Sequence, residues 1–355
     1  MTELPRGMSR ETSSRVRSWI GHWGSRLFWG IRTRSRRVWP LRLGRRVWWI
    51  LRTQANRGVC SIEIANDHVG FFAQTNWCLY IFYHCERHGL IPDIRLTGKA
   101  YLDHRRGPNW LNYYFDLAYP MSPEEVTRRV RYTKRMVRFE EIGPLYWPKM
   151  TVEDGSRLLY KYLRPKPHIK KIIDEFWSTL RTDGPVVGVH FRGTDKSTEA
   201  PRVSWNHCLR VLKKYLHDHR EVRAMFVASD EQAFIDFLKK SAIGISTHSR
   251  DDSYRSRDDQ PVHTENVEVD GYARGEDALV NALLLSRCTT LIRTTSFLSA
   301  WASIFNPTLK IILLNKPYDK TLWYPESEIL RKHDTEYLPE LAPPGSSNGA
   351  KISTA

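Results

Sequence analysis

Five ionisable side chains follow a short apolar run in the segment VVGVHFRGTDKSTEAP, residues 186–201. They are His190, Arg192, Asp195, Lys196 and Glu199. An arginine presents a planar fork of donors that matches a phosphate, and fixed cations stabilise the charge that develops on a leaving diphosphate. A carboxylate nearby accepts the proton of an attacking hydroxyl group. The segment therefore predicts a diphosphate clamp formed by Arg192 and Lys196, with Gly193 loosening the loop and Glu199 as the general base.

A solvated loop is the alternative interpretation of these charges, with Asp195 capping the turn after the strand. The familiar phosphate fingerprints are missing, because the GTDKS stretch lacks the spacing of a Walker loop and no GxGxxG follows a strand. Binding of a nucleotide sugar requires neither fingerprint. Two more polar clusters elsewhere in the chain favour a site over a plain loop.

The elements around the segment indicate a parallel sheet. From residue 184, short apolar strands alternate with amphipathic helices, which is typical of an α/β fold with a doubly wound sheet. The strands AMFVAS and TTLIRT also end in polar residues, which are Ser229 and Asp230 in the first and the stretch RTTS (Arg293, Thr294, Thr295 and Ser296) in the second. Ligands of such sheets bind outside the carboxyl ends of the strands, so we expect the three clusters to face one crevice.

The whole chain of 355 residues is expected to form four segments. They are a leader at 1–58, an α/β domain at 59–183, a Rossmann-like domain at 184–325, and a carboxy-terminal segment at 326–355 with a disordered tail. In the second segment, a buried helix ending at Gly89 lies between two strands, and residues 122–180 are predicted to be largely helical. The aromatic residues at 101–115 form part of the core or a platform for a sugar, and we favour the core.

The leader carries most of the net charge of +16. It holds fourteen arginines, no lysine and two glutamates, which amounts to +12, together with six of the thirteen tryptophans. Arginine interleaved with tryptophan suits an anionic membrane surface, while a transit peptide or a nucleic-acid-binding arm remains an alternative. No run of 18 apolar residues and no signal peptide is present, so we predict a cytoplasmic protein peripheral to the inner face of a membrane.

Cysteine and histidine spacing does not indicate a metal site. The five cysteines lack CxxC spacing and sit among apolar residues, which predicts buried thiols in a reducing compartment. The pairs Asp251-Asp252 and Asp258-Asp259 lie in a charged loop, which weakens their interpretation as metal ligands. We therefore predict no metal and no resident cofactor.

The stretches HFRGTDK with EAP, FVASDEQAF and ALVNALLLSRCTTLIRTTSFLSAWASIF resemble, in this order, three motifs of GDP-fucose-dependent fucosyltransferases. The closest groups are the α1,6 type, including the rhizobial nodulation-factor enzymes, and the protein O-fucosyltransferases. The resemblance covers about residues 184–318. It implies a GT-B fold with two Rossmann-like domains, and metal-independent, inverting transfer of fucose from GDP-fucose to an oligosaccharide or glycolipid.

The resemblance also implies roles for individual residues. Arg192 contacts the β-phosphate, Asp195 and Lys196 organise the loop, and Glu199 is the candidate base. The nucleotide pocket is lined by His190, Gly193, Ser229, Asp230, Asp277, Asn281, Thr294, Thr295 and Ser296. Asn281 stands where the family often has an aspartate, and Asp277 lies one helical turn earlier on the same face, where it substitutes for that aspartate.

Two alternatives stay open at this point. In the first alternative the protein has the same fold but uses another nucleotide sugar as its donor, since no residue of the sequence can be assigned to recognition of the base or of the 6-methyl group of the sugar. A basic protein that binds nucleic acid through its leader is the alternative from another class, although we expect no nucleic acid partner. Steep salt dependence without sequence preference would favour that alternative.

Overall fold

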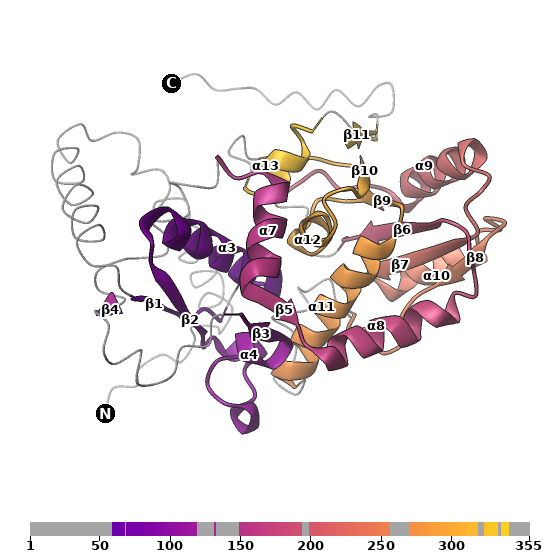
Figure 1. The fold of residues 1–355 in the computed structure, drawn as a ribbon. Helices are drawn as coiled ribbons and strands as arrows, with labels where there is room; N and C mark the ends of the chain where they lie inside the picture. The colour runs from indigo at the N-terminus through magenta and orange to yellow at the C-terminus, as the bar shows by residue number, and fades with distance from the viewer. Residues whose placement is uncertain are drawn as a thin grey trace, which may run out of the picture. The chain divides into compact units, whose positions relative to one another are not determined.

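The computed structural model describes residues 59–67, 69–118, 131–132, 149–193, 199–255, 270–318, 323–332 and 335–340 (Figure 1). The chain divides into two compact units, Met1–Arg57 and Gly58–Ala355, and the described residues all belong to the second. The predicted leader, the loop residues Asp195 and Lys196, and the predicted disordered tail lie outside the described residues.

A three-stranded parallel sheet begins the described chain. Its strands β1 (Val59–Ile64), β2 (Ile91–Leu96) and β4 (Arg131–Tyr132) lie in the order β2-β1-β4. Helix α3 (Phe71–His88) connects β1 to β2, and Gly89 ends it with a φ of 61°. This left-handed conformation favours glycine, and the helix end agrees with the sequence prediction.

The segments between the two sheets are mostly helical. Helix α7 (Val152–Tyr162) begins at a capping box formed by Thr151 and Asp154, and α8 (Pro167–Thr179) begins at a proline. A short helix, α4 (Leu111–Tyr114), precedes β3 (Phe115–Leu117), which pairs antiparallel with β5 (Leu163–Pro165).

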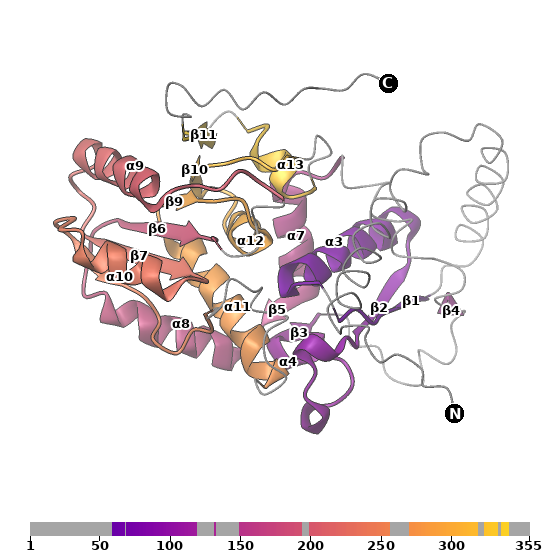
Figure 2. The same ribbon diagram turned by 180° about the vertical axis from the view of Figure 1, so that it is seen from behind.

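A six-stranded sheet in the order β11-β10-β9-β6-β7-β8 forms the larger layer, and all its pairings are parallel (Figures 1 and 2). Its strands are β6 (Val186–Phe191), β7 (Ala224–Ser229), β8 (Ser246–His248), β9 (Thr290–Arg293), β10 (Lys310–Leu313) and β11 (Thr335–Tyr337). The helices that connect them or follow them are α9 (Trp205–Asp218), α10 (Gln232–Lys240), α11 (Gly271–Arg287), α12 (Phe297–Phe305) and α13 (Glu326–Ile329).

Helices cover both faces of the large sheet. On one face, alternate residues of β6 such as Val187 and Val189 join one buried cluster with apolar residues of α9 and α10. On the other, Gly188 faces Cys288 at the end of α11, and Phe226 contacts Phe176 of α8. Burial on both faces explains why β6 is buried at every position and reads as an apolar run.

The predicted fold class is confirmed, because the described chain is α/β with two separate parallel sheets. Five short strands were not predicted. β8 and β11 have three residues each and lie at the edges of the large sheet, and β3 has three residues at the end of the aromatic segment. β4 and β5 have two and three residues within the segment 122–180 that we expected to be largely helical. Strands this short carry too few residues for an alternating pattern.

The buried interior matches other expectations from the sequence. All five cysteines (Cys60, Cys78, Cys85, Cys208 and Cys288) are buried and free, as predicted. Contacts through α3 tie the first sheet to the carboxy-terminal part: Asn76 Nδ2 donates to the carbonyl oxygen of Tyr324 at 2.8 Å, and Phe72 lies 5.1 Å from Trp301 between ring centroids. Within the described ranges, no helix has the length and apolar character needed to cross a membrane.

Candidate active site

The three predicted polar clusters lie at one edge of the large sheet. β6 pairs with both β7 and β9, and all three strands run parallel. Phe191 lies opposite Ser229, and His190 lies opposite Arg293. The residues that follow these strands therefore meet at the carboxyl edge, where open parallel sheets bind their ligands.

Hydrogen bonds tie the beginning of the charged loop to both neighbouring strand ends. The backbone N–H of Arg192 donates to Thr294 Oγ1 at 2.9 Å, and the N–H of Thr294 donates to the carbonyl oxygen of His190 at 3.0 Å. On the other side, the N–H of Gly193 donates to Asp230 Oδ1 at 3.1 Å. The loop entrance is thus held by Asp230 and Thr294, the residues that directly follow β7 and β9.

The side chain of Arg192 is 17% exposed. Its Nε is 3.8 Å from Asp230 Oδ2. Burial raises the pKa of Tyr101 to about 12, while the positive charges of Arg274 and Arg192 act in the opposite direction. Arg192 and Arg274 therefore both lie close enough to this buried hydroxyl for their charges to act on it.

Gly193 leaves room for the Glu231 side chain beside the loop. A Cβ at this position would lie 2.0 Å from Glu231 Oε1. Glu231 is fixed in turn, because its Oε2 accepts a hydrogen bond from Trp205 Nε1 at 2.9 Å and its backbone N–H donates to Ser229 Oγ at 3.1 Å. Any larger residue would displace this carboxylate.

A buried polar network supports the turn Thr294–Ser296. Thr295 Oγ1 donates to Glu326 Oε1 at 2.6 Å, and its backbone N–H donates to Asn315 Oδ1 at 2.7 Å. Arg293, which is fully buried, forms an ion pair with Glu326 Oε2 at 2.8 Å and donates to the carbonyl oxygen of Ser296 at 3.1 Å. The ion pair of Arg293 and Glu326 therefore stabilises the turn through hydrogen bonds to Thr295 and Ser296.

Two members of this network, Asn315 and Glu326, were not predicted from the sequence, and Arg293 was noted only as the first residue of the polar strand end 293–296. Asn315 follows β10 at the same edge of the sheet. A search for polar residues just after each apolar strand, which found the other members of the site, also finds this one. Arg293 is a charged residue at the end of a strand that is otherwise buried, which is a signal in itself. Glu326 offers no such signal, because nothing local marks it as the partner of a strand 33 residues away.

Asp277 and Asn281 lie on one face of α11, as their spacing predicts. Asn281 Nδ2 donates to Asp277 Oδ1 at 2.9 Å. Asp277 also accepts from Arg250 Nη1 at 3.0 Å, Ser253 Oγ at 2.8 Å and the backbone N–H of Tyr254 at 3.2 Å. Burial raises the pKa of Asp277, and the Arg250 charge opposes that shift. These bonds join the pair to the loop after β8 rather than to Arg192.

Glu199 is half-buried, and its carbonyl oxygen accepts a hydrogen bond from the backbone N–H of Tyr318 at 2.8 Å. The segment that carries the candidate base therefore lies beside the chain that leaves β10. Because Asp195 and Lys196 lie outside the described residues, their roles stay predictions. Across the described ranges, no group of three or more His, Cys, Asp or Glu residues is arranged to hold a metal ion.

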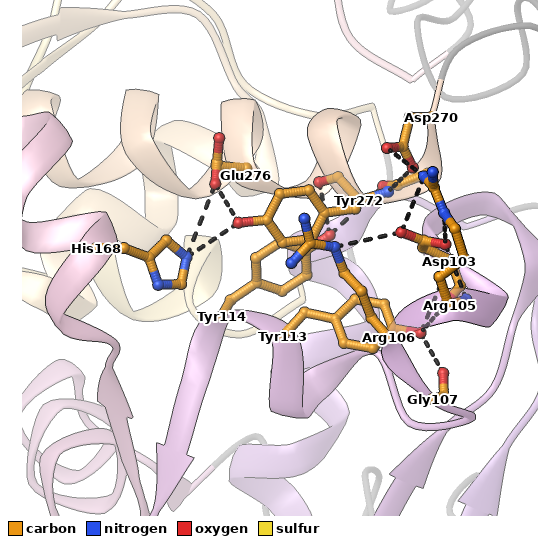
Figure 3. Close-up of polar contacts among 11 residues, drawn as sticks. Asp103, Arg105, Arg106, Gly107, Tyr113, Tyr114, His168, Asp270, Tyr272 and Glu276 are labelled. Atoms are coloured by element: carbon orange, nitrogen blue, oxygen red, sulfur yellow. Dashed lines mark hydrogen bonds and ion pairs between the residues drawn. The ribbon is translucent and has the colours of Figure 1, made fainter.

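The aromatic segment at 101–115 packs against the start of α11 (Figure 3). The ring of Tyr114 stacks on the ring of Tyr272 at 5.4 Å between centroids, and the Arg106 guanidinium lies 3.6 Å from the centroid of the Tyr272 ring. The Tyr272 hydroxyl donates to Glu276 and lies 3.0 Å from His168 Nε2.

Burial decides between the two interpretations of the aromatic segment. Its aromatic side chains are all less than 10% exposed: Tyr101, Trp110, Tyr113, Tyr114 and Phe115. A sugar stacks on an open ring face, and these rings have none to offer. The core interpretation is confirmed, and the segment joins the first sheet to α11.

The Nodulation protein Z (NodZ) family matches residues 145–327, which is 183 of the 355 residues. The chain is 25% identical over 176 residues to nodulation protein Z of Bradyrhizobium diazoefficiens, a match that covers 46% of each chain. It is also 25% identical over 163 residues to the Azorhizobium caulinodans protein of the same name, covering 43% of this chain and 48% of the relative. The chain spans about half the length of these curated relatives.

Solved structures with similarity to the chain include NodZ α-1,6-fucosyltransferase soaked with GDP-fucose, with 15% identity and a TM-score of 0.46. That match covers 74% of this chain and 99% of the other. Arabidopsis thaliana FUT1 in complex with GDP follows with 12% identity and a TM-score of 0.44, covering 78% of this chain and 76% of the other.

Proposed function

The chain belongs to the nodulation protein Z (NodZ) family, and from this premise we propose that it is a glycosyltransferase that uses GDP-fucose as its donor. It transfers fucose, with inversion and without a metal ion, to a hydroxyl group of an oligosaccharide or glycolipid. The NodZ enzyme named above carries the name α-1,6-fucosyltransferase and was studied with GDP-fucose, which supports this donor.

The observation that carries the proposal is the fixed position of Arg192 at the carboxyl edge of the large sheet. Its backbone is bonded to Thr294 and its guanidinium lies near Asp230. An arginine fixed in advance can contact a diphosphate without reorganising when negative charge develops on it. Lys196 is the second cation in this proposal.

The reaction proceeds as a direct displacement. The acceptor oxygen forms a bond to the anomeric carbon of fucose while the bond from that carbon to the β-phosphate oxygen breaks. GDP leaves with the electron pair, and Arg192 and Lys196 stabilise its charge. Glu199 takes the proton of the acceptor hydroxyl. Asp195 organises the loop that carries these groups.

In this proposal the fold is of the GT-B type, and the nucleotide half of the donor binds outside the carboxyl ends of the strands of the large sheet. We assign its contacts to the strand ends and to the nearby face of α11. The residues are His190, Gly193, Ser229, Asp230, Asp277, Asn281, Thr294, Thr295 and Ser296. The leader at 1–58 holds the protein at an anionic membrane surface, where glycolipid acceptors are found.

Transfer assays with the full chain in EDTA test the proposal. GDP-fucose, GDP-mannose and a UDP-sugar are each offered with soluble oligosaccharides and with detergent-solubilised glycolipids. We expect transfer from GDP-fucose alone, with Glu199→Gln reducing kcat by roughly 100-fold or more. Transfer from a different donor would keep the fold and overturn the assignment of fucose.

A further inference from the structure

Asn315 bridges two segments of the candidate site. Its Oδ1 accepts the backbone N–H of Thr295 at 2.7 Å, and its Nδ2 donates to the carbonyl oxygen of Pro201 at 2.8 Å. The side chain is buried, with the residue only 5% exposed. One amide thus joins the turn after β9 to the segment that begins at Glu199.

Backbone hydrogen bonds on either side of Asn315 reinforce the bridge. The N–H of Leu314 donates to the carbonyl oxygen of Arg293 at 2.9 Å, and the N–H of Tyr318 donates to the carbonyl oxygen of Glu199 at 2.8 Å. Residues 314–318 therefore lie between the turn that supports the donor and the chain that carries the base. A shift of this segment would change the distance between the two.

The amide is chemically matched to its place. One end must accept a hydrogen bond and the other must donate one, and a carboxamide supplies both in a fixed geometry. A leucine of similar volume supplies neither. Buried bonds of this kind hold a side chain or loop within the narrow tolerance that proton transfer needs.

We propose that Asn315 is a positioning residue that sets the distance between the Thr294–Ser296 turn and Glu199, so that the base meets a donor held by Arg192. This role rests on the proposed function. It is not catalytic, because Asn315 acts on the reaction through Glu199 and makes no contact with the reacting atoms.

The experiment compares Asn315→Ala and Asn315→Leu with Asn306→Ala in the full chain. Asn306 is a matched control: its Nδ2 also donates to a carbonyl oxygen, that of Ser286 at 2.8 Å, but it ends α12 away from the site. We expect both Asn315 variants to lower kcat for GDP-fucose by about 10- to 100-fold. Their GDP dissociation constants should change by less than about fivefold, and Asn306→Ala should keep its kcat.

A double variant separates positioning from general destabilisation. If Asn315 acts through Glu199, then Asn315→Ala added to Glu199→Gln should cost less than about threefold beyond Glu199→Gln alone. Multiplied effects, or normal kcat in folded Asn315 variants, would overturn the role. If Asn315→Ala fails to fold in thermal melts, Asn315→Leu decides the question.

The proposed function and this role fail in different ways. A wild-type chain with no turnover of GDP-fucose would refute both. Turnover by the wild type with unchanged kcat in the Asn315 variants would refute the role of Asn315 alone.

Discussion

Among single residues, Arg192 matters most for the proposed diphosphate clamp. Its backbone N–H donates to Thr294 Oγ1, its Nε lies 3.8 Å from Asp230 Oδ2, and its charge opposes the rise in the pKa of Tyr101. The neighbouring glycine leaves room for the Glu231 carboxylate. The backbone of the loop and the neighbouring side chains thus fix the position of this cation.

Replacing Arg192 with alanine should weaken the binding of GDP. The lost charge-assisted contact is worth roughly 1.5–3 kcal/mol, which corresponds to an increase of about 10- to 150-fold in Kd. Calorimetric titration of GDP measures this change. Arg210→Ala serves as the control, since the Arg210 side chain is 66% exposed and pairs with Glu340. Equal affinities for the wild type and the Arg192 variant would refute the diphosphate clamp.

The sequence was sufficient to find most of the polar residues at the sheet edge, because each of them directly follows an apolar strand. His190, Arg192, Asp230 and Thr294 are joined by hydrogen bonds or by a close ion pair. The partners behind them were harder to find. Glu326 lies in a separate helix and reaches Arg293 only through the fold, so its pairing has no local pattern.

At the scale of elements, long strands and helices followed from periodicity, while the short edge strands did not. β6 and β7 have six residues each, and α3 has eighteen. β8 has only Ser246, Thr247 and His248, whose sequence shows no strand pattern. These residues form a strand because they pair with β7. Tertiary pairing, not propensity, decides such strands.

Helix α3 carries a buried histidine that should make stability depend on pH. Burial, and secondly the nearby His88, lowers the pKa of His84 from 6.5 to about 3. The folded protein therefore keeps this imidazole neutral where the unfolded chain binds a proton. This histidine therefore leaves the free energy of unfolding unchanged above pH 6.5. As the pH drops from 6.5 toward 3, its protonation in the unfolded chain should lower that free energy by up to about 1.4 kcal/mol per pH unit.

Urea unfolding midpoints at pH 7.5 and 5.5 measure this contribution. His84→Gln should show a smaller loss of stability between the two pH values than the wild type. His217→Gln, at a side chain that is 73% exposed, provides the control. If all three proteins lose the same stability, His84 is not the source of the pH dependence.

At the scale of the whole molecule, the compact unit Gly58–Ala355 joins a small and a large parallel sheet through buried contacts of α3, α7 and α12. Tyr324 contacts two of these helices. Its carbonyl oxygen accepts a hydrogen bond from Asn76 in α3, and its hydroxyl donates to the carbonyl oxygen of Thr151, at the start of α7, at 3.0 Å. The predicted division into domains at residues 183 and 325 remains a prediction.

Removal of residues 1–57 should separate membrane attachment from catalysis. The remaining unit contains every residue that we assign to the site, so its turnover should stay within about threefold of that of the full chain. Flotation with anionic vesicles should be lost, because the leader supplies +12 of the net charge of +16. Equal flotation of both proteins would contradict the proposed role of the leader.

Calorimetric titration of the full chain with GDP, UDP and ADP in the presence of EDTA tests the proposed nucleotide site most directly. We expect tight binding of GDP alone, since the proposed clamp binds a diphosphate without a metal ion and the proposed donor is GDP-fucose. Selective binding of UDP or ADP would contradict the donor, and a requirement for a divalent cation would contradict the metal-independent clamp. Failure of all three nucleotides to bind would contradict the assignment of this sheet edge as a nucleotide site.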